Sequence, residues 1–136
     1  MWHDAGVGFD QYHEPPDELS HQTRTFARLC SSLTEEAEAI GWYEQRLDVE
    51  ADAEAGAIMR DAQGEEFKHF CMDLEFLLRR TPLWREIAMG ILFQEGDIVA
   101  HGEESEEEAV EGAAARGAPL AGGTSLGIGA LRGAAG

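Results

Sequence analysis

Two long segments of this chain carry apolar residues at helical spacing, one directly after the other, and this pattern predicts a helical hairpin. The first segment runs from about Glu18 to Leu47, and the second runs from Asp52, a suitable N-cap, to about Arg80. In each segment the apolar side chains form one narrow stripe, along which we expect the two helices to pack. The stripes consist of Phe26, Leu29, Leu33, Ile40 and Leu47 in the first segment and of Met59, Phe67, Phe70, Leu74 and Leu77 in the second.

A third, shorter helix is predicted for the sequence PLWREIAMGILF, because Pro82 interrupts the second helix and suits the first turn of a new one. The expected fold is therefore all-α, with an antiparallel hairpin of two long helices and a short third helix. The flanking segments are rich in Gly and Pro, or in Glu, Gly and Ala, and lack the apolar side chains that would order them. The predicted organisation is a flexible arm over residues 1–17, a helical domain over 18–98, a flexible linker over 99–123 and a C-terminal peptide over 124–136.

The C-terminal peptide differs from the linker because it contains three closely spaced apolar residues within TSLGIGALRG. These residues are Leu126, Ile128 and Leu131. A short apolar motif among glycines is typical of a segment that docks on a partner.

The charge of the chain excludes several classes of partner. There are 27 acidic and 10 basic residues, which gives a formal net charge of −17. Such a surface repels nucleic acid and anionic membranes and leaves cations as the natural small partners. The start of the chain lacks the features of a secretory signal, and no run of about 18 apolar residues could span a bilayer. We therefore expect a cytosolic protein that binds neither nucleic acid nor membranes.

Glu36 is the residue that first indicates a metal site, because it lies along the apolar stripe of the first helix, beside Leu29 and Ile40. An ionised carboxylate in an apolar environment costs several kcal/mol unless it is paired, protonated or bound to a metal. The neighbouring Glu35 and Glu38 point away from the stripe and are expected on the solvated face.

The second helix adds Glu66 and His69, which stand three residues apart and so share one face of the helix. Di-iron carboxylate proteins use this Glu-x-x-His spacing together with a Glu from another helix. An antiparallel hairpin would bring Glu36 opposite this pair. Carboxylates can bridge two metal ions, and the imidazole supplies a neutral ligand.

One chain offers only half of such a site, since a ferritin-like centre takes its ligands from four helices. The sequence therefore predicts a two-fold dimer, which would supply each ligand twice, complete the four-helix arrangement and bury the stripes that a lone hairpin exposes. Three further residues lie near the ligands. Tyr43 is expected either to contact a ligand or to pack as a core tyrosine, Trp42 to pack at the interface, and Asp73 to contact a ligand from the same face.

Several sequence blocks resemble consecutive segments of encapsulated ferritins. They are HEP near the start, EEAEAIGWYEQR, GEEFKHFCMDLEFLLRR and ILFQEGDI, which together cover residues 13–98. In addition, SLGIGALRG resembles the short peptides that load cargo into encapsulin shells.

The resemblance implies a ferroxidase, which oxidises Fe(II) to Fe(III) with oxygen at a di-iron centre. It implies a homodecamer ring built from dimers, enclosed in an encapsulin nanocompartment in a bacterial or archaeal cytoplasm, where the shell stores the iron mineral. The residues that match the ferroxidase ligands are Glu36, Glu66 and His69 from both subunits, and those that match acidic residues guiding incoming metal are Glu35, Glu38 and Glu65. The resemblance also implies that Leu126, Ile128 and Leu131 dock on the shell.

Two alternatives remain open from the residues themselves. One is an acidic helical cargo protein that binds metal without turnover. The other is a di-metal oxidase that uses manganese, because a set of carboxylates and imidazoles does not select iron over manganese or zinc.

Overall fold

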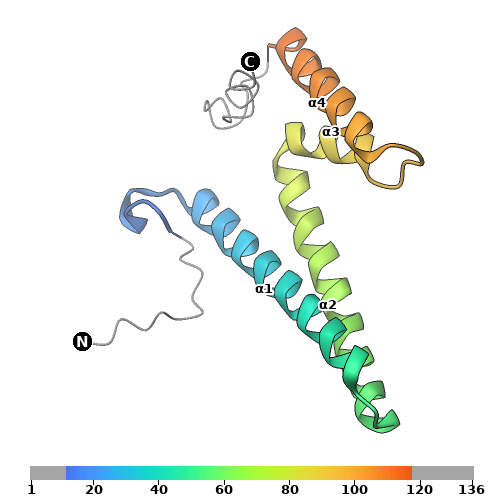
Figure 1. The fold of residues 1–136 in the computed structure, drawn as a ribbon. Coiled ribbons are helices and arrows are strands. Elements are labelled where there is room, and N and C mark those ends of the chain that lie inside the picture. Colours follow the sequence, from blue (N-terminus) through green and yellow to red (C-terminus); the bar gives the residue numbers. More distant parts are fainter. Residues whose placement is uncertain (1–11, 118–136) are drawn as a thin grey trace, which may run out of the picture. The chain divides into compact units, whose positions relative to one another are not determined.

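The computed structural model describes residues 12–117, and the regular structure of this part of the chain is helical, without a strand. The chain divides into two compact units, one ending at Leu77 and the other beginning at Leu78. Figure 1 shows the elements in chain order. They are a short 3-10 helix, Pro16–Glu18, and the α-helices α1 (His21–Val49), α2 (Ala53–Arg80), α3 (Pro82–Ile91) and α4 (Ile98–Ala115).

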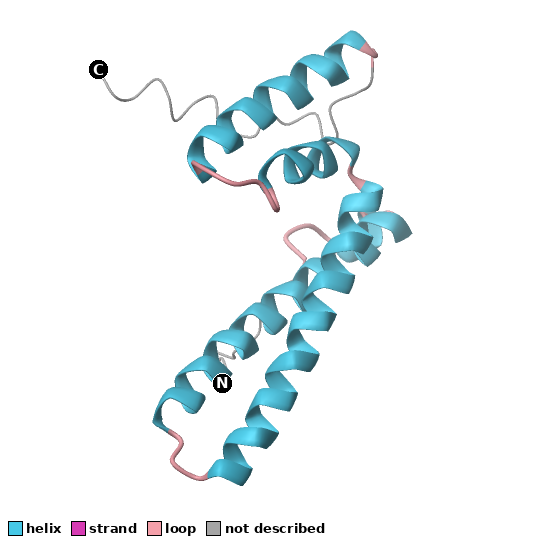
Figure 2. Cartoon of the chain, turned by 90° about the vertical axis from the view of Figure 1, so that its right-hand side faces the viewer, coloured by secondary structure: helices cyan, strands magenta, loops and turns pink. Residues whose placement is uncertain are grey.

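Helices α1 and α2 form the predicted antiparallel hairpin, joined by a short turn, as Figures 1 and 2 both show. Helix α1 begins at His21, slightly later than predicted, because the Ser20 hydroxyl accepts a hydrogen bond from the Thr23 main-chain N–H at 3.1 Å and caps the helix. Asp52 caps α2 as expected, accepting a hydrogen bond from the main-chain N–H of Ala55 at 2.8 Å.

The hairpin buries few apolar side chains within one protomer. Of the ten residues in the two predicted stripes, Leu77 is fully buried, eight are half-buried, and Phe67 is 50% exposed. Other large apolar side chains of the hairpin are also exposed, among them Trp42, Ile58 and Met72. The protomer therefore leaves apolar surface that a second surface could cover.

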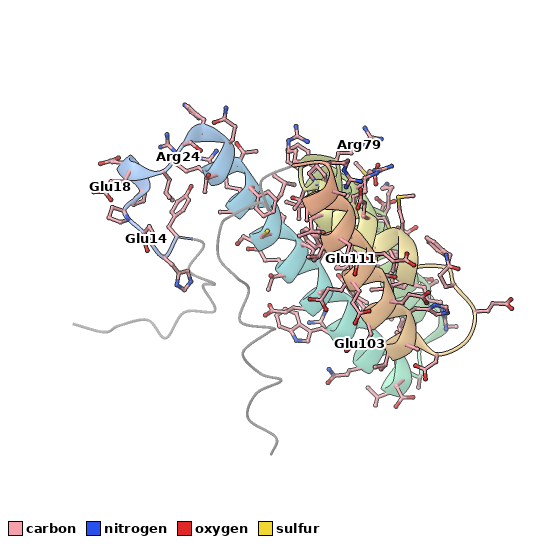
Figure 3. All side chains as sticks on the ribbon, turned by 90° about the horizontal axis from the view of Figure 1, so that it is seen from above. Glu14, Glu18, Arg24, Arg79, Glu103 and Glu111 are labelled. Atoms are coloured by element: carbon pink, nitrogen blue, oxygen red, sulfur yellow. The ribbon has the colours of Figure 1, made fainter. Side chains whose placement is uncertain are left out.

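The second unit contains a helix that the sequence analysis did not predict. Residues 99–123 were expected to form a flexible linker, but α4 spans Ile98–Ala115, so this expectation is wrong for that part of the segment. Asp97 caps the helix by accepting a hydrogen bond from the Ala100 main-chain N–H at 3.0 Å. Glu and Ala have high helix propensity, and the exposed side is acidic, with Glu103 and Glu111 among the residues that Figure 3 labels.

Helix α4 packs on α3 through small residues rather than large apolar ones. The buried residues of α4 are Ser105, Ala109 and Ala113, which recur every four residues and so form one face. A Cβ atom placed on Gly90 of α3 would lie 2.6 Å from the Cβ of Ser105, so the absence of a side chain at Gly90 permits this close approach. Arg116, at the end of α4, pairs with Glu86 of α3 at 2.8 Å.

The remaining expectations on chain organisation concern residues at the two ends. Residues 1–11 of the predicted arm and the whole C-terminal peptide, 124–136, lie outside the described residues. The predicted arm does contain the short helix Pro16–Glu18. Within residues 12–117, no helix combines the length and the hydropathy needed to cross a membrane.

The Gly90 contact predicts that Gly90→Ala destabilises the α3–α4 unit. We expect the free energy of unfolding to fall by about 1–3 kcal/mol, because the new methyl group overlaps the Ser105 side chain. Thermal and urea unfolding followed by circular dichroism measure this change.

Gly102→Ala is the matched control, since a Cβ there would be 4.0 Å from Ile91 Cδ1, an ordinary contact. We expect this control to keep or raise stability, by up to about 1 kcal/mol, through helix propensity. Equal stability of Gly90→Ala and wild type would contradict the packing described for α3 and α4.

Candidate metal centre

The structure brings Glu36, Glu66 and His69 together between α1 and α2. Each offers one ligand atom, and these atoms lie within 4.8 Å of one another. Glu36 and Glu66 are half-buried, whereas His69 is exposed. Two carboxylates and an imidazole at this separation form a group that could hold a divalent metal ion.

The local sequence explains why the three side chains converge. Glu66 and His69 are three residues apart on α2 and therefore lie on one face of that helix. Glu36 lies within the stripe of α1 that faces α2, seven residues after Leu29 and four before Ile40. The antiparallel turn between α1 and α2 places this stripe against the Glu66 and His69 face.

The electrostatic environment of Glu36 is unfavourable for its charged form. Burial raises the pKa of Glu36 to about 7, and a side-chain hydrogen bond with Asp73 and the nearby charges of Asp73, Glu66 and Glu35 add to this shift. The Oε2 atom of Glu36 is buried and has no hydrogen-bond partner. A buried acceptor without a donor is costly in a protein and is the condition that a bound cation relieves.

Asp73, one turn after His69 on α2, also has a buried carboxylate oxygen, Oδ2, without a hydrogen-bond partner. It lies beside Glu36 and is one of the groups that raise the pKa of Glu36. Asp73 is four residues after His69 and is not part of the group of three ligand atoms. Its position suits a residue that contacts a ligand rather than the metal, which is the role expected from sequence.

The three acidic residues expected to guide incoming metal are all exposed. Glu35 and Glu38 flank Glu36 on α1, and Glu65 precedes Glu66 on α2. Glu65 forms an ion pair with Lys68, which lowers the pKa of Glu65. An exposed ion pair of this kind contributes little to stability, so Glu65 stays available to solvent cations.

Tyr43 and Trp42 lie further along α1. The guanidinium of Arg46 stacks over the half-buried Tyr43 ring, 5.3 Å from its centroid. Trp42 is 48% exposed and lines a shallow surface groove with Gln45 and Arg46. Neither aromatic residue belongs to the group of three ligand atoms. The three residues expected to dock on a shell, Leu126, Ile128 and Leu131, lie outside the described part of the chain.

Gln63 is a residue of this region that the sequence analysis missed. It is buried and donates hydrogen bonds from α2 to Ile40 and Glu44 of α1. A sequence signal was present, because Gln63 stands three residues before Glu66 and so lies on the same face of α2.

Comparison with known proteins shows where this hairpin belongs. A family model described as EncFtn-like matches residues 11–95, which include α1, α2, α3 and all the candidate ligands. The chain belongs to the EncFtn-like family. This membership supports an iron-related role, because relatives in this family are named as ferritin-like proteins.

Two curated relatives are similar to this EncFtn-like chain over most of their length. The encapsulated ferritin-like protein of Rhodospirillum rubrum is 41% identical over 124 residues, which cover 90% of this chain and 89% of the relative. The ferritin-like protein of Thermotoga maritima is 41% identical over 96 residues, which cover 71% of this chain and 84% of the relative. A crystal structure of a protein from Nitrosomonas europaea is 38% identical with a TM-score of 0.63, and the match covers 65% of this chain and 98% of that one.

The raised pKa of Glu36 predicts a pH-dependent gain in stability for Glu36→Gln in the metal-free protein. Because the pKa of Glu36 is raised on folding, the folded state holds its proton more tightly, and the stability contributed by this group is lost as the pH rises through about 7. We expect Glu36→Gln to melt a few degrees above wild type at pH 8, and the difference to shrink at pH 5, where the wild-type carboxyl is already protonated.

Thermal unfolding in the presence of a chelator measures this effect at both pH values. Glu38→Gln is the matched control, since Glu38 is exposed on the same helix. A gain that is the same at pH 5 and pH 8 would contradict the raised pKa of Glu36.

Proposed function

We propose that this protein is a ferroxidase that oxidises Fe(II) to Fe(III) with oxygen. The observation that carries the proposal is the convergence of Glu36, Glu66 and His69, next to buried carboxylate oxygens that have no hydrogen-bond partner. Carboxylates and imidazole suit iron, and the EncFtn-like family to which the chain belongs includes relatives named as ferritin-like. Iron is the substrate of this reaction.

The proposed centre holds two iron ions between two subunits. One protomer supplies one group of three ligands, whereas a ferritin-like di-iron centre draws ligands from four helices. A two-fold axis beside the hairpin would supply the second set, and the exposed apolar side chains of α1 and α2 support such an interface. We further propose that these dimers assemble into a homodecamer ring.

The residues act on the iron mainly through charge and geometry. The carboxylates of Glu36 and Glu66 favour the higher charge of Fe(III), which lowers the potential of the iron and assists transfer of one electron from each ion to oxygen. Oxygen takes up these electrons with protons from solvent. The exposed acidic side chains of Glu35, Glu38 and Glu65 attract Fe(II) toward the centre.

The proposed setting is the lumen of an encapsulin nanocompartment in the cytoplasm, where the shell would store the oxidised iron. The Rhodospirillum rubrum relative is named an encapsulated protein, and the match to it covers 90% of this chain. We propose that Leu126, Ile128 and Leu131 of the C-terminal peptide dock on the shell protein.

The first test is Fe(II) oxidation in air by wild type, Glu66→Ala and His69→Ala. We expect each substitution to reduce the initial rate by about 100-fold or more, because each removes a ligand from both copies of the set. The rate is followed by absorbance of the ferric product, with assembly checked by light scattering.

Asp61→Ala is the matched control, because it removes an exposed carboxylate from the same helix and should oxidise iron at the wild-type rate. Equal rates in all four proteins would contradict the proposed ligands and favour the alternative of a cargo protein that binds metal without turnover. Activity that requires manganese in place of iron would favour the di-metal oxidase alternative.

A second test removes the residues after Thr124. We expect the truncated protein to keep its oxidation rate, since all the proposed ligands lie on α1 and α2, but to be lost from the shell when it is co-expressed with an encapsulin. Co-purification with the shell, measured by gel filtration and mass spectrometry, decides this point. Unchanged loading would exclude the proposed docking role.

A further inference from the structure

Gln63 is a buried polar residue beside the candidate metal centre that the proposed reaction does not use. It is only 8% exposed. Its Nε2 atom donates one hydrogen bond to the main-chain oxygen of Ile40 at 3.2 Å and another to Oε2 of Glu44 at 2.9 Å. Both acceptors belong to α1, so this one amide joins α2 to α1 at two points.

The chemistry of the two acceptors determines how the amide is oriented. A main-chain carbonyl cannot donate a hydrogen bond, and neither can a carboxylate. The nitrogen of Gln63, which has two N–H groups, must therefore face α1. Each N–H group then has its own acceptor, and the bond to a carboxylate is the stronger of the two kinds.

The position of this contact relates it directly to the ligands. Gln63 lies three residues before Glu66 on α2, and Ile40 lies four residues after Glu36 on α1. In an antiparallel pair, one turn back along α2 is opposite one turn forward along α1. The contact is therefore one helical turn from the point where Glu36 meets Glu66 and His69. A slip of α2 by one residue, about 1.5 Å, would disturb both hydrogen bonds and the ligand group together.

Apolar packing alone specifies this register weakly. The stripe residues around the contact, including Ile40 and Phe70, are only half-buried in the protomer. Apolar contacts are also non-directional, so helices can slide or rotate with little change in buried area. Buried polar groups are known to fix the register of packed helices, as a single buried Asn does in coiled coils.

We propose that Gln63 is a positioning residue, which sets the register of α2 against α1 and so holds Glu66 and His69 opposite Glu36. Glu44 is its partner in this role, although the Glu44 side chain is exposed and lies outside the ligand group. The expected effect of Gln63 on metal binding rests on the proposed function. The expected effect of Gln63 on the register of the metal-free hairpin does not rest on it.

The test uses the full chain with Gln63→Met, which keeps the length of the side chain but removes both donors. Anaerobic titration with Co(II) gives the dissociation constant and, from the visible spectrum, the ligand geometry. We expect the dissociation constant to rise about tenfold and the spectrum to change, as is typical when a residue that orients metal ligands is removed. Gln22→Met, the same change at an exposed position of α1, should leave both unchanged.

Glu44→Ala is the second variant, and it removes one of the two acceptors without changing a buried residue. We expect a rise in the dissociation constant of about threefold, smaller than for Gln63→Met because the bond to Ile40 remains. The double variant should bind Co(II) as Gln63→Met does, since Glu44 acts through Gln63. If the two substitutions acted independently through general stability, their free-energy effects would add in the double variant.

Hydrogen–deuterium exchange of the metal-free proteins supplies a readout that needs no metal. We expect faster exchange over residues 60–70 in Gln63→Met than in wild type or Gln22→Met. The inference would be overturned if Gln63→Met folds and shows the wild-type affinity for Co(II) and the wild-type exchange rate. If Gln63→Met does not fold, a Glu44→Ala protein with the wild-type dissociation constant would overturn it. If wild type itself fails to bind Co(II), the proposed function fails, and the exchange data alone then decide the role of Gln63.

Discussion

The structure of the hairpin depends on one constraint, which is that the carboxyl group of Glu36 must be accommodated between two helices. Its Oε2 atom is buried without a partner, and the neighbouring carboxyls of Asp73 and Glu66 oppose its ionisation. In the metal-free protomer the favourable response is to keep a proton, which is why the pKa of Glu36 is raised. A divalent cation offers a second response, because it would satisfy several carboxylates at once.

This constraint limits how much the hairpin can gain from apolar burial. A helix face that carries ligands cannot also be filled with leucine, and the stripe residues along α1 and α2 are accordingly only half-buried in one protomer. Fully buried apolar packing is found at Leu77, near the end of α2. A metal ion or a second subunit that bound only the folded form would add stability to the hairpin. Binding and folding are therefore linked in the proposed dimer.

The sequence was sufficient to predict the hairpin because its signals are local and strong. The periodic stripes, the Asp52 cap and the break at Pro82 each correspond to an observed feature. The grouping of Glu36 with Glu66 and His69 was also predictable, since it follows from helical spacing and an antiparallel turn. The roles of these residues as iron ligands stay predictions until metal binding is measured.

Helix α4 was missed because its packing does not depend on large apolar residues. Its buried face is made of Ser105, Ala109 and Ala113, and its approach to α3 requires the missing side chain of Gly90. Hydropathy gives these residues little weight, so an acidic segment rich in alanine was interpreted as a linker. The periodicity of small residues, combined with a helix cap at Asp97, was the signal that could have indicated the helix.

Gln63 and Glu36 show how two polar residues of one hairpin can serve different purposes. The amide nitrogen of Gln63 has both of its donors satisfied by α1, so it stabilises one arrangement of the helices and has no spare capacity on that nitrogen for a ligand. An oxygen of Glu36 is unsatisfied in the same interface, so it favours whatever brings positive charge to it. In the proposed centre, the satisfied amide of Gln63 sets the geometry and the unsatisfied carboxylate of Glu36 binds the metal. The Gln63 contact and Glu36 lie about one helical turn apart along the hairpin. The register that Gln63 fixes therefore extends to the position of Glu36.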